Sequence, residues 1–318
     1  MFDIHPQTLQ YWYKNFLSDY HPDIAGGLWH PGKIETVDTD TGEVKAKPVY
    51  VLKKENLGEK MSIDDKGIGH AGFTIFSNHT TGKIALLVES TNAEEVEQAM
   101  GLISEELWKV KAISMDMSPT YALVCSNLMP RATQVIDKFH VIKYVYDAVS
   151  EVRKNIRKEI ANSLTKGKKK TEEDKRKLSE IEHLRRIRHA ITQSPDKWTE
   201  AMEASVNRAF EQHPNLKTAY QISQDFKLWY TYGNCYKPTS QITKELYSWY
   251  SRAIQLKEFG SVIKMIRKHE DEIINYFRHG MTNARAERLN GKIQRFVSSN
   301  YGIKDKDFAL YRIANYFS

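Results

Sequence analysis

The chain has 318 residues, of which 41% are hydrophobic and 27% are charged, a globular composition with room for one large domain or two smaller ones. No run of eighteen apolar residues is present, and the N-terminus lacks the layout of a signal peptide. The two cysteines, Cys125 and Cys235, are too few for a disulfide framework or a zinc cluster, so a reducing cytoplasm is the expected location.

The charge is distributed unevenly along the chain. Residues 1–140 carry 13 basic and 19 acidic side chains, a net charge of −6, whereas residues 141–318 carry 34 and 21, a net charge of +13. This pattern is typical of a protein whose basic half binds a polyanion, while the acidic half holds metal ions at the reactive centre. The alternative is a solvated, lysine-rich helical surface without that role.

Residues 1–58 are expected to form a helix followed by a linker. Apolar and aromatic residues between Leu9 and Leu17 recur at helical spacing, which predicts one amphipathic helix over residues 1–20. Residues 22–58 are rich in glycine and proline, with a turn signal that ends at Gly42, so we expect a linker with a small hairpin.

Residues 59–140 alternate between β-rich runs and helical spacing. The expected order is strand, hairpin, helix, strand, helix and strand, at residues 60–63, 72–76 with 83–88, 93–107, 112–115, 119–128 and 132–136. This is the order of a ribonuclease-H-like core, in which a right-handed crossover makes the first and fourth strands neighbours.

Acidic residues follow three of these strands. Asp64 and Asp116 would lie side by side, and Asp64 is favoured over Asp65 because it directly follows the β-rich run and adjacent strand residues face opposite ways. Asp137 ends the last strand, and His140 follows three residues later. Carboxylates and an imidazole at the carboxyl edge of parallel strands suit a hard metal ion. The alternative role for Asp116 is to cap the following helix.

Residues 141–280 are predicted to be helical throughout. The expected helices cover residues 141–164, 178–192, 195–212, 216–232, 239–255 and 259–277. The basic connector 166–177 is expected to be solvated, with weak non-specific DNA contact as the alternative. The aromatic side chains of this segment are expected in its core, the alternative being that Trp229 or Trp249 stacks on an exposed base.

A helix that begins near Asn283 carries the last candidate residues. Asn283, Glu287 and Asn290 are spaced to share one face. Four basic side chains flank that face: Arg285, Arg288, Lys292 and Arg295. One carboxylate on a strip of amides among basic side chains is unusual for a plain surface helix. A packing helix is expected over residues 308–314.

Phosphodiester transfer by two metal ions needs carboxylates that hold two Mg²⁺ ions about 3.5–4 Å apart. Mg²⁺ prefers oxygen ligands and takes few of them from the protein, which leaves room for substrate phosphates. Asp64, Asp116 and Glu287 meet that need in the expected fold, and the amide and basic side chains near Glu287 would hold the DNA backbone.

With these motifs the chain resembles the DDE transposases of bacterial insertion sequences, in the ISL-three-like group. The resemblance rests on Tyr121 and on residues 62–66, 114–117, 130–132, 137–141 and 282–292. Each segment alone is a weak signal, but their combined order and spacing across residues 60–310 is specific. Asp65 departs from the glutamate that the family usually has at that position.

The resemblance implies an α/β fold, a ribonuclease-H-like mixed-sheet core interrupted by a large all-α insertion. It divides the chain into four segments. They are an N-terminal helix and linker (1–58), the first part of the core (59–140), the all-α insertion (141–280), and a C-terminal part of the core that carries the third acid (281–318). Asp64, Asp116 and Glu287 would be the metal ligands. Asp137 and His140 would support the site or contact the scissile strand.

The implied activity is that of a DNA transposase. Such an enzyme uses Mg²⁺ or Mn²⁺ to cut one strand at each element end and joins the freed 3′-hydroxyl to target DNA, as a homo-oligomer in the bacterial cytoplasm at the nucleoid. Asn283, Asn290 and the four basic residues would bind double-stranded DNA. Two alternatives stay open: a non-catalytic DNA-binding protein derived from a transposase, and a structure-selective nuclease on the same core.

Relatives of this kind usually carry zinc-binding and helix-turn-helix modules in front of the core, whereas little precedes residue 22 here. We therefore expect either a separate N-terminal DNA-binding polypeptide or a chain that represents the catalytic portion alone.

Overall fold

The computed structural model describes residues 4–18, 20, 32–37, 41–68, 71–165, 171–281, 284–299 and 305–318. These residues form two compact units, one from Met1–Asp137 with Met281–Ser318 and one from Lys138–Gly280. The expected insertion, residues 141–280, begins three residues after the start of the second unit. No helix in the described ranges has the length and apolar content needed to cross a bilayer.

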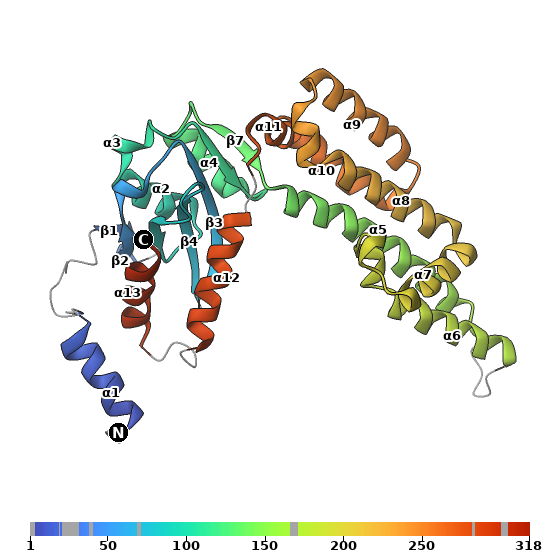
Figure 1. Cartoon of the computed structure of the whole chain (residues 1–318), viewed down its shortest axis with the longest axis horizontal. Helices are drawn as coiled ribbons and strands as arrows, with labels where there is room; N and C mark the ends of the chain where they lie inside the picture. The colour runs from blue at the N-terminus through green and yellow to red at the C-terminus, as the bar shows by residue number, and fades with distance from the viewer. Residues whose placement is uncertain are drawn as a thin grey trace. The chain divides into compact units, whose positions relative to one another are not determined.

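A seven-stranded mixed sheet organises the first unit (Figure 1). Its strand order is β1-β2-β5-β4-β3-β6-β7. The strands are β1 (Gly32–Val37), β2 (Val44–Leu52), β3 (Lys60–Ile68), β4 (Ala71–Asn78), β5 (Ile84–Val88), β6 (Ala112–Met115) and β7 (Thr133–Ile136). β3, β4 and β5 pair antiparallel, whereas β6 pairs parallel with both β3 and β7. The expected mixed α/β core and the neighbouring first and fourth strands of that core are confirmed.

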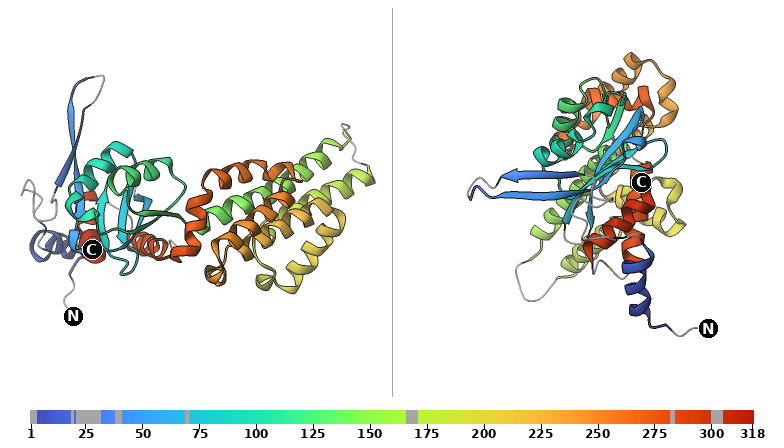
Figure 2. Two further views of the ribbon diagram at one scale, coloured as in Figure 1. Left: turned by 90° about the horizontal axis from the view of Figure 1, so that it is seen from above. Right: turned by 90° about the vertical axis from the view of Figure 1, so that its left-hand side faces the viewer.

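The sheet differs from the expectation at two places. β3 does not end at Asp64 but continues to Ile68, because it pairs with β4 along its whole length. The hairpin expected in the linker, β1–β2, joins the sheet because β2 pairs with β5. Figure 2 shows this hairpin projecting from the rest of the unit. Val37 and Val44, the last pair of the hairpin, are both exposed.

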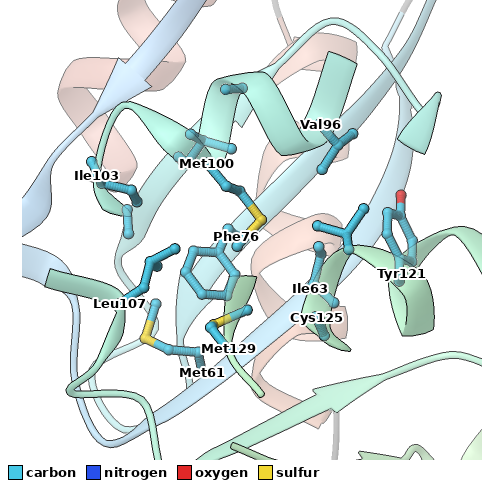
Figure 3. Packing of buried hydrophobic residues seen from close by; sticks show 14 of the residues in the cluster. Met61, Ile63, Phe76, Val96, Met100, Ile103, Leu107, Tyr121, Cys125 and Met129 are labelled. Atoms are coloured by element: carbon cyan, nitrogen blue, oxygen red, sulfur yellow. The ribbon is translucent and has the colours of Figure 1, made fainter. Parts of the chain in front are cut away.

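One face of the sheet is covered by α2 (Ala93–Gly101), α3 (Ser104–Leu107) and α4 (Pro119–Leu128). Met61, Ile63 and Phe76 point into these helices and are fully buried, as Figure 3 shows. Burying one such side chain contributes about 1.5–3 kcal/mol. The expected single helix over 93–107 is wrong, because the backbone leaves helical geometry at Ile103.

The opposite face is covered by α12 (Ala284–Ser299) and α13 (Lys306–Phe317), which pack against β3 and against β2 and β5. Ile293 of α12 and Leu310 of α13 are fully buried there, together with Phe73 and Ile75 of β4. The last segment of the sequence therefore completes the core that the first segment begins.

The N-terminal helix is shorter than expected. α1 (Pro6–Trp12) continues as one π-helical turn, Tyr13–Leu17. This segment attaches to α13 through an ion pair between Lys14 and Asp305. Its remaining apolar side chains are exposed to solvent rather than buried: Leu9, Trp12, Phe16 and Leu17.

The second unit contains no strand among its described residues. Its helices are α5 (Lys138–Asn162), α6 (Glu172–Arg186), α7 (Glu200–Gln212), α8 (Pro214–Trp229), α9 (Thr239–Ala253), α10 (Gly260–Lys268) and α11 (Glu270–His279). Gly280 ends α11 with φ of +59°, a left-handed conformation that glycine adopts without strain. The single helix expected over 259–277 is wrong, because His269 leaves helical geometry between α10 and α11.

Two tryptophans of this unit belong to its core. Trp229 and Trp249 are 7% and 2% exposed. Their indole N–H groups donate to the backbone carbonyls of Ile242 and Ile222. Both rings are therefore packed in the core of this unit, as expected. Of the basic connector, residues 166–170 lie outside the described residues.

Candidate active site

Three aspartates follow one another across three neighbouring parallel strands. β3 and β6 pair up to Ser62 and Ser114, and extending that register by two residues aligns Asp64 with Asp116. The Asp137 amide donates to the carbonyl of the residue before Asp116 at 2.8 Å, so Asp137 is aligned with Asp116 in the same way. By this register the three aspartates occupy one row of backbone positions across the sheet, which we call the aspartate row.

Asp64 and Asp65 face opposite sides of the sheet. Asp64 is paired with Ile75, a residue of the core beneath α12 and α13. Asp65 is paired with Thr74, whose hydroxyl lies 3.1 Å from the Tyr121 hydroxyl of α4. Because directly opposed residues of antiparallel strands share a face, Asp64 faces α12 and Asp65 faces α4.

α12 is joined directly to Asp64. The side-chain amide of Asn290 donates a 2.8 Å hydrogen bond to a carboxylate oxygen of Asp64. Glu287 precedes Asn290 by three residues and therefore lies on the same side of the helix, where it is exposed. Three buried side chains hold α12 on the sheet: Ala286, Leu289 and Ile293. The fold thus brings Glu287 to the sheet face that carries Asp64 and Asp116.

Asp116 also shapes the start of α4. Its carboxylate accepts a hydrogen bond from the Ser118 amide at 2.9 Å, and α4 begins at Pro119, a residue suited to a first helical position. This bond forms a turn just before the helix rather than the expected alternative of a helix cap, because the N-cap residue is Ser118 and α4 has no side-chain cap bond. It fixes the direction of this side chain at the end of β6.

Tyr121 lies close to the negative charge of this region. Thr74 donates its hydroxyl proton to the Ser90 carbonyl at 2.6 Å, so the bond at 3.1 Å between the two hydroxyls is donated by Tyr121. Burial raises the pKa of Tyr121 above its ordinary value. Three carboxylates raise this pKa further: Asp65, Asp116 and Asp64.

The donor set fits a hard divalent cation in its chemistry. Carboxylate oxygens are the ligands that Mg²⁺ prefers, and the strand alignment puts those of Asp64 and Asp116 on one face. Among the described residues, however, no three His, Cys, Asp or Glu side chains lie close enough together to hold a metal ion.

Asp137 and His140 belong to different units. Asp137 is 1% exposed and ends β7 within the sheet unit. His140 lies in the first turn of α5, in the helical unit, half-buried and with its ring against Phe139. Asp137 therefore belongs to the aspartate row, and His140 follows it three residues later at the start of the helical unit.

The four basic side chains of α12 are all exposed: Arg285, Arg288, Lys292 and Arg295. At 3.6 residues per turn they fall within about 80° of one another and roughly opposite Asn290. We call them the basic stripe. Asn290, which the sequence grouped with them, is instead hydrogen-bonded to Asp64. Asn283 lies outside the described residues.

The bond between Asn290 and Asp64 has no direct signal in the sequence. The spacing of Glu287 and Asn290 indicates a shared helix side, but not the residue that this side meets. The helical spacing and the family resemblance both include Tyr121, but its bond to Thr74 depends on the pairing of β3 with β4.

Comparison with known proteins gives a family match and distant relatives. The family model for DDE transposases of the ISL3 type, described as "Transposase", matches residues 61–313. The chain is 22% identical over 247 residues to the transposase for insertion sequence element IS1557 in two strains of Mycobacterium tuberculosis, covering 74% of this chain and 54% of that protein. It is 21% identical over 209 residues to the transposase for insertion sequence element IS1001 of Bordetella parapertussis, covering 64% and 47%.

The chain spans about half the length of the curated relatives it matches. No solved structure matches it.

Proposed function

The chain belongs to the DDE transposase family of the ISL3 group, and we propose that it cuts DNA at the ends of an insertion sequence and joins the freed ends to target DNA. The observation that supports this proposal most is the alignment of Asp64 with Asp116 on β3 and β6, beside a helix that carries Glu287 and is bonded to Asp64.

In this proposal Asp64, Asp116 and Glu287 hold one or two Mg²⁺ or Mn²⁺ ions through their carboxylate oxygens. Such ions supply activation of the attacking oxygen and charge stabilisation at the leaving oxygen. Asn290 keeps the Asp64 carboxylate in a fixed orientation through its side-chain amide. Asp137 adds a buried carboxylate to the end of the row, and we retain His140 as a residue that supports the site or contacts the scissile strand.

The reaction needs no covalent intermediate between protein and DNA. Water cuts one strand at each element end, and the freed 3′-hydroxyl attacks the target strand. Tyr121 is close to the carboxylates but is an unsuitable nucleophile, because it is buried, donates its proton to Thr74 and has a raised pKa.

The basic stripe of α12 is proposed to hold the DNA backbone. Its four side chains extend along about 15 Å of helix, and contacts to phosphates of this kind do not depend on the base sequence. Asn283 is proposed to contact DNA at the start of α12. We further propose a homo-oligomer that brings two element ends together at the nucleoid, with a further DNA-binding polypeptide as a possible partner.

Cleavage of a labelled element-end duplex in Mg²⁺ or Mn²⁺ tests the proposal. Asp116→Asn and Glu287→Gln are expected to bind the duplex and leave it uncut, because each keeps its shape and loses its charge. Asp65→Asn is the matched control, since Asp65 is adjacent to Asp64 but faces α4. We expect it to cut like the unmodified chain.

Two outcomes would favour the other candidate functions. Binding without cleavage by the unmodified chain, even with candidate partner proteins added, would indicate a non-catalytic DNA-binding protein. Nicks without any strand-transfer product would indicate a nuclease on the same core.

A further inference from the structure

Two buried serines lie beside the aspartate row. Ser62 precedes Asp64 by two residues on β3, and Ser114 precedes Asp116 by two residues on β6, so each serine shares a sheet face with its aspartate. The two serines are direct partners in the parallel pairing of β3 with β6. They are 1% and 0% exposed, and within the described part of the chain neither hydroxyl oxygen has a hydrogen-bond partner.

Space filling alone does not account for these hydroxyls. A buried hydroxyl without a partner has lost its bonds to water, which is unfavourable. Alanine has nearly the same size and would fill either position without that cost. Buried polar groups that lack a protein partner are usually bonded to an ordered water molecule, which itself needs two to four polar neighbours.

The two serines and the two aspartates that follow them on the same face supply four such neighbours. Residues two apart on a strand have Cα atoms about 6.7 Å apart, and neither serine hydroxyl bonds directly to the next carboxylate on that face. One water molecule spans such a gap. The neighbours are then the hydroxyls of Ser62 and Ser114 and the carboxylates of Asp64 and Asp116.

We propose that Ser62 and Ser114 are positioning residues that share one ordered water molecule with the carboxylates of Asp64 and Asp116. The hydrogen bonds balance. Each serine donates its proton to the water oxygen, which accepts two bonds, and the water donates one proton to each carboxylate. The two aspartates are thereby held at a fixed separation from within the sheet.

The inference rests on the proposed function for what the aspartates do, namely bind a divalent cation. Groups that orient metal ligands from behind change metal affinity about 10- to 100-fold when they are removed. The role of the serines can therefore be tested by measuring the Mn²⁺ affinity of the whole chain without DNA, by electron paramagnetic resonance. We expect Ser62→Ala and Ser114→Ala each to weaken Mn²⁺ binding by about tenfold or more.

Ser77→Ala is the matched control. Ser77 lies directly opposite Ser62 on β4, on the same sheet face, and is 3% exposed. The β4 residue that lies opposite Asp64, two positions before Ser77, is Ile75 and carries no carboxylate. Ser77→Ala is expected to bind Mn²⁺ like the unmodified chain. Unchanged Mn²⁺ affinity in Ser62→Ala and Ser114→Ala, or an equal loss in all three variants, would overturn the proposal.

Urea unfolding in the absence of metal separates this inference from the proposed function. A hydroxyl bonded to water stabilises the fold, so Ser62→Ala and Ser114→Ala are expected to lower the urea midpoint. A raised midpoint would mean that the hydroxyls have no partner, and the inference would fail. If the unmodified chain binds no Mn²⁺, the proposed function fails, and the urea midpoints still decide whether the shared water exists.

Discussion

The bond between Asn290 and Asp64 predicts that one amide controls both the local stability of α12 and the rate of DNA cleavage. The perturbation is Asn290→Ala, which removes the donor of the 2.8 Å bond and leaves the apolar face of α12 unchanged. A hydrogen bond to a charged group contributes about 1.5–3 kcal/mol to stability. Asp64 is half-buried, which places the expected loss at the lower end of that range.

Amide hydrogen exchange of α12, followed by mass spectrometry, measures this loss. Because about 1.4 kcal/mol corresponds to a factor of ten in an equilibrium, we expect the α12 amides to exchange roughly tenfold faster in Asn290→Ala. Amides of α8 in the helical unit should exchange at an unchanged rate. Cleavage of the element-end duplex should fall by about 10- to 100-fold, since Asn290 orients a proposed metal ligand.

Gln294→Ala is the control for this variant, because Gln294 is an exposed amide one turn further along α12. If Asn290→Ala and Gln294→Ala exchange and cleave alike, the bond to Asp64 contributes nothing, and the reasoning that links α12 to the aspartate row is wrong. Faster exchange with full cleavage would assign the bond to stability alone.

Three further predictions concern other parts of the molecule. Lys292→Ala in the basic stripe should weaken DNA binding equally for all sequences and reduce the slope of log affinity against log salt by about one, measured by fluorescence anisotropy. A sequence-dependent loss would refute a backbone contact. Tyr121→Phe should still cut DNA, and its free energy of unfolding in urea should fall by about 0.5–1.5 kcal/mol, because only a hydrogen bond is removed. Loss of cleavage with the fold intact would show that the hydroxyl acts in the reaction. Backbone amides of Thr165 and Thr171 hold the pKa of Asp174 well below its ordinary value. The carboxylate therefore stabilises the start of α6 at pH values above its unfolded pKa of about 3.9, and this stabilisation is lost as pH falls through the lower pKa of the folded state. The amide signals of α6 should report the loss. Asp174→Asn should abolish this pH dependence.

The neighbouring strands of Asp64 and Asp116 could be predicted because the order of elements and the right-handed crossover leave few arrangements. The length of β3 could not. Asp65 to Gly67 have no β-rich pattern, and they are extended because β4 pairs with them residue by residue. Likewise, β2 pairs with β5, but the local sequence of neither segment indicates which strand it pairs with.

The sequence likewise predicts only part of the carboxylate site. The spacing of Glu287 and Asn290 identifies one side of a helix, whereas the contact of Asn290 with Asp64 joins residues 226 positions apart. The helix breaks at Ile103 and His269 were missed for a local reason. Both residues lie within continuous apolar spacing, and only their backbone angles end the helices.

The sheet unit is assembled from two segments that are separated in the chain by the whole helical unit. During synthesis the strands with Asp64 and Asp116 therefore emerge long before α12, and the sheet face with Phe73 and Ile75 stays uncovered until residues 284–317 follow. Domains generally fold as they leave the ribosome, N-terminal parts first. A product cut short anywhere before α12 would hold two aligned aspartates but neither Glu287 nor Asn290. Under the proposed function, the polypeptide therefore acquires its third candidate metal ligand only after α12 has been synthesised.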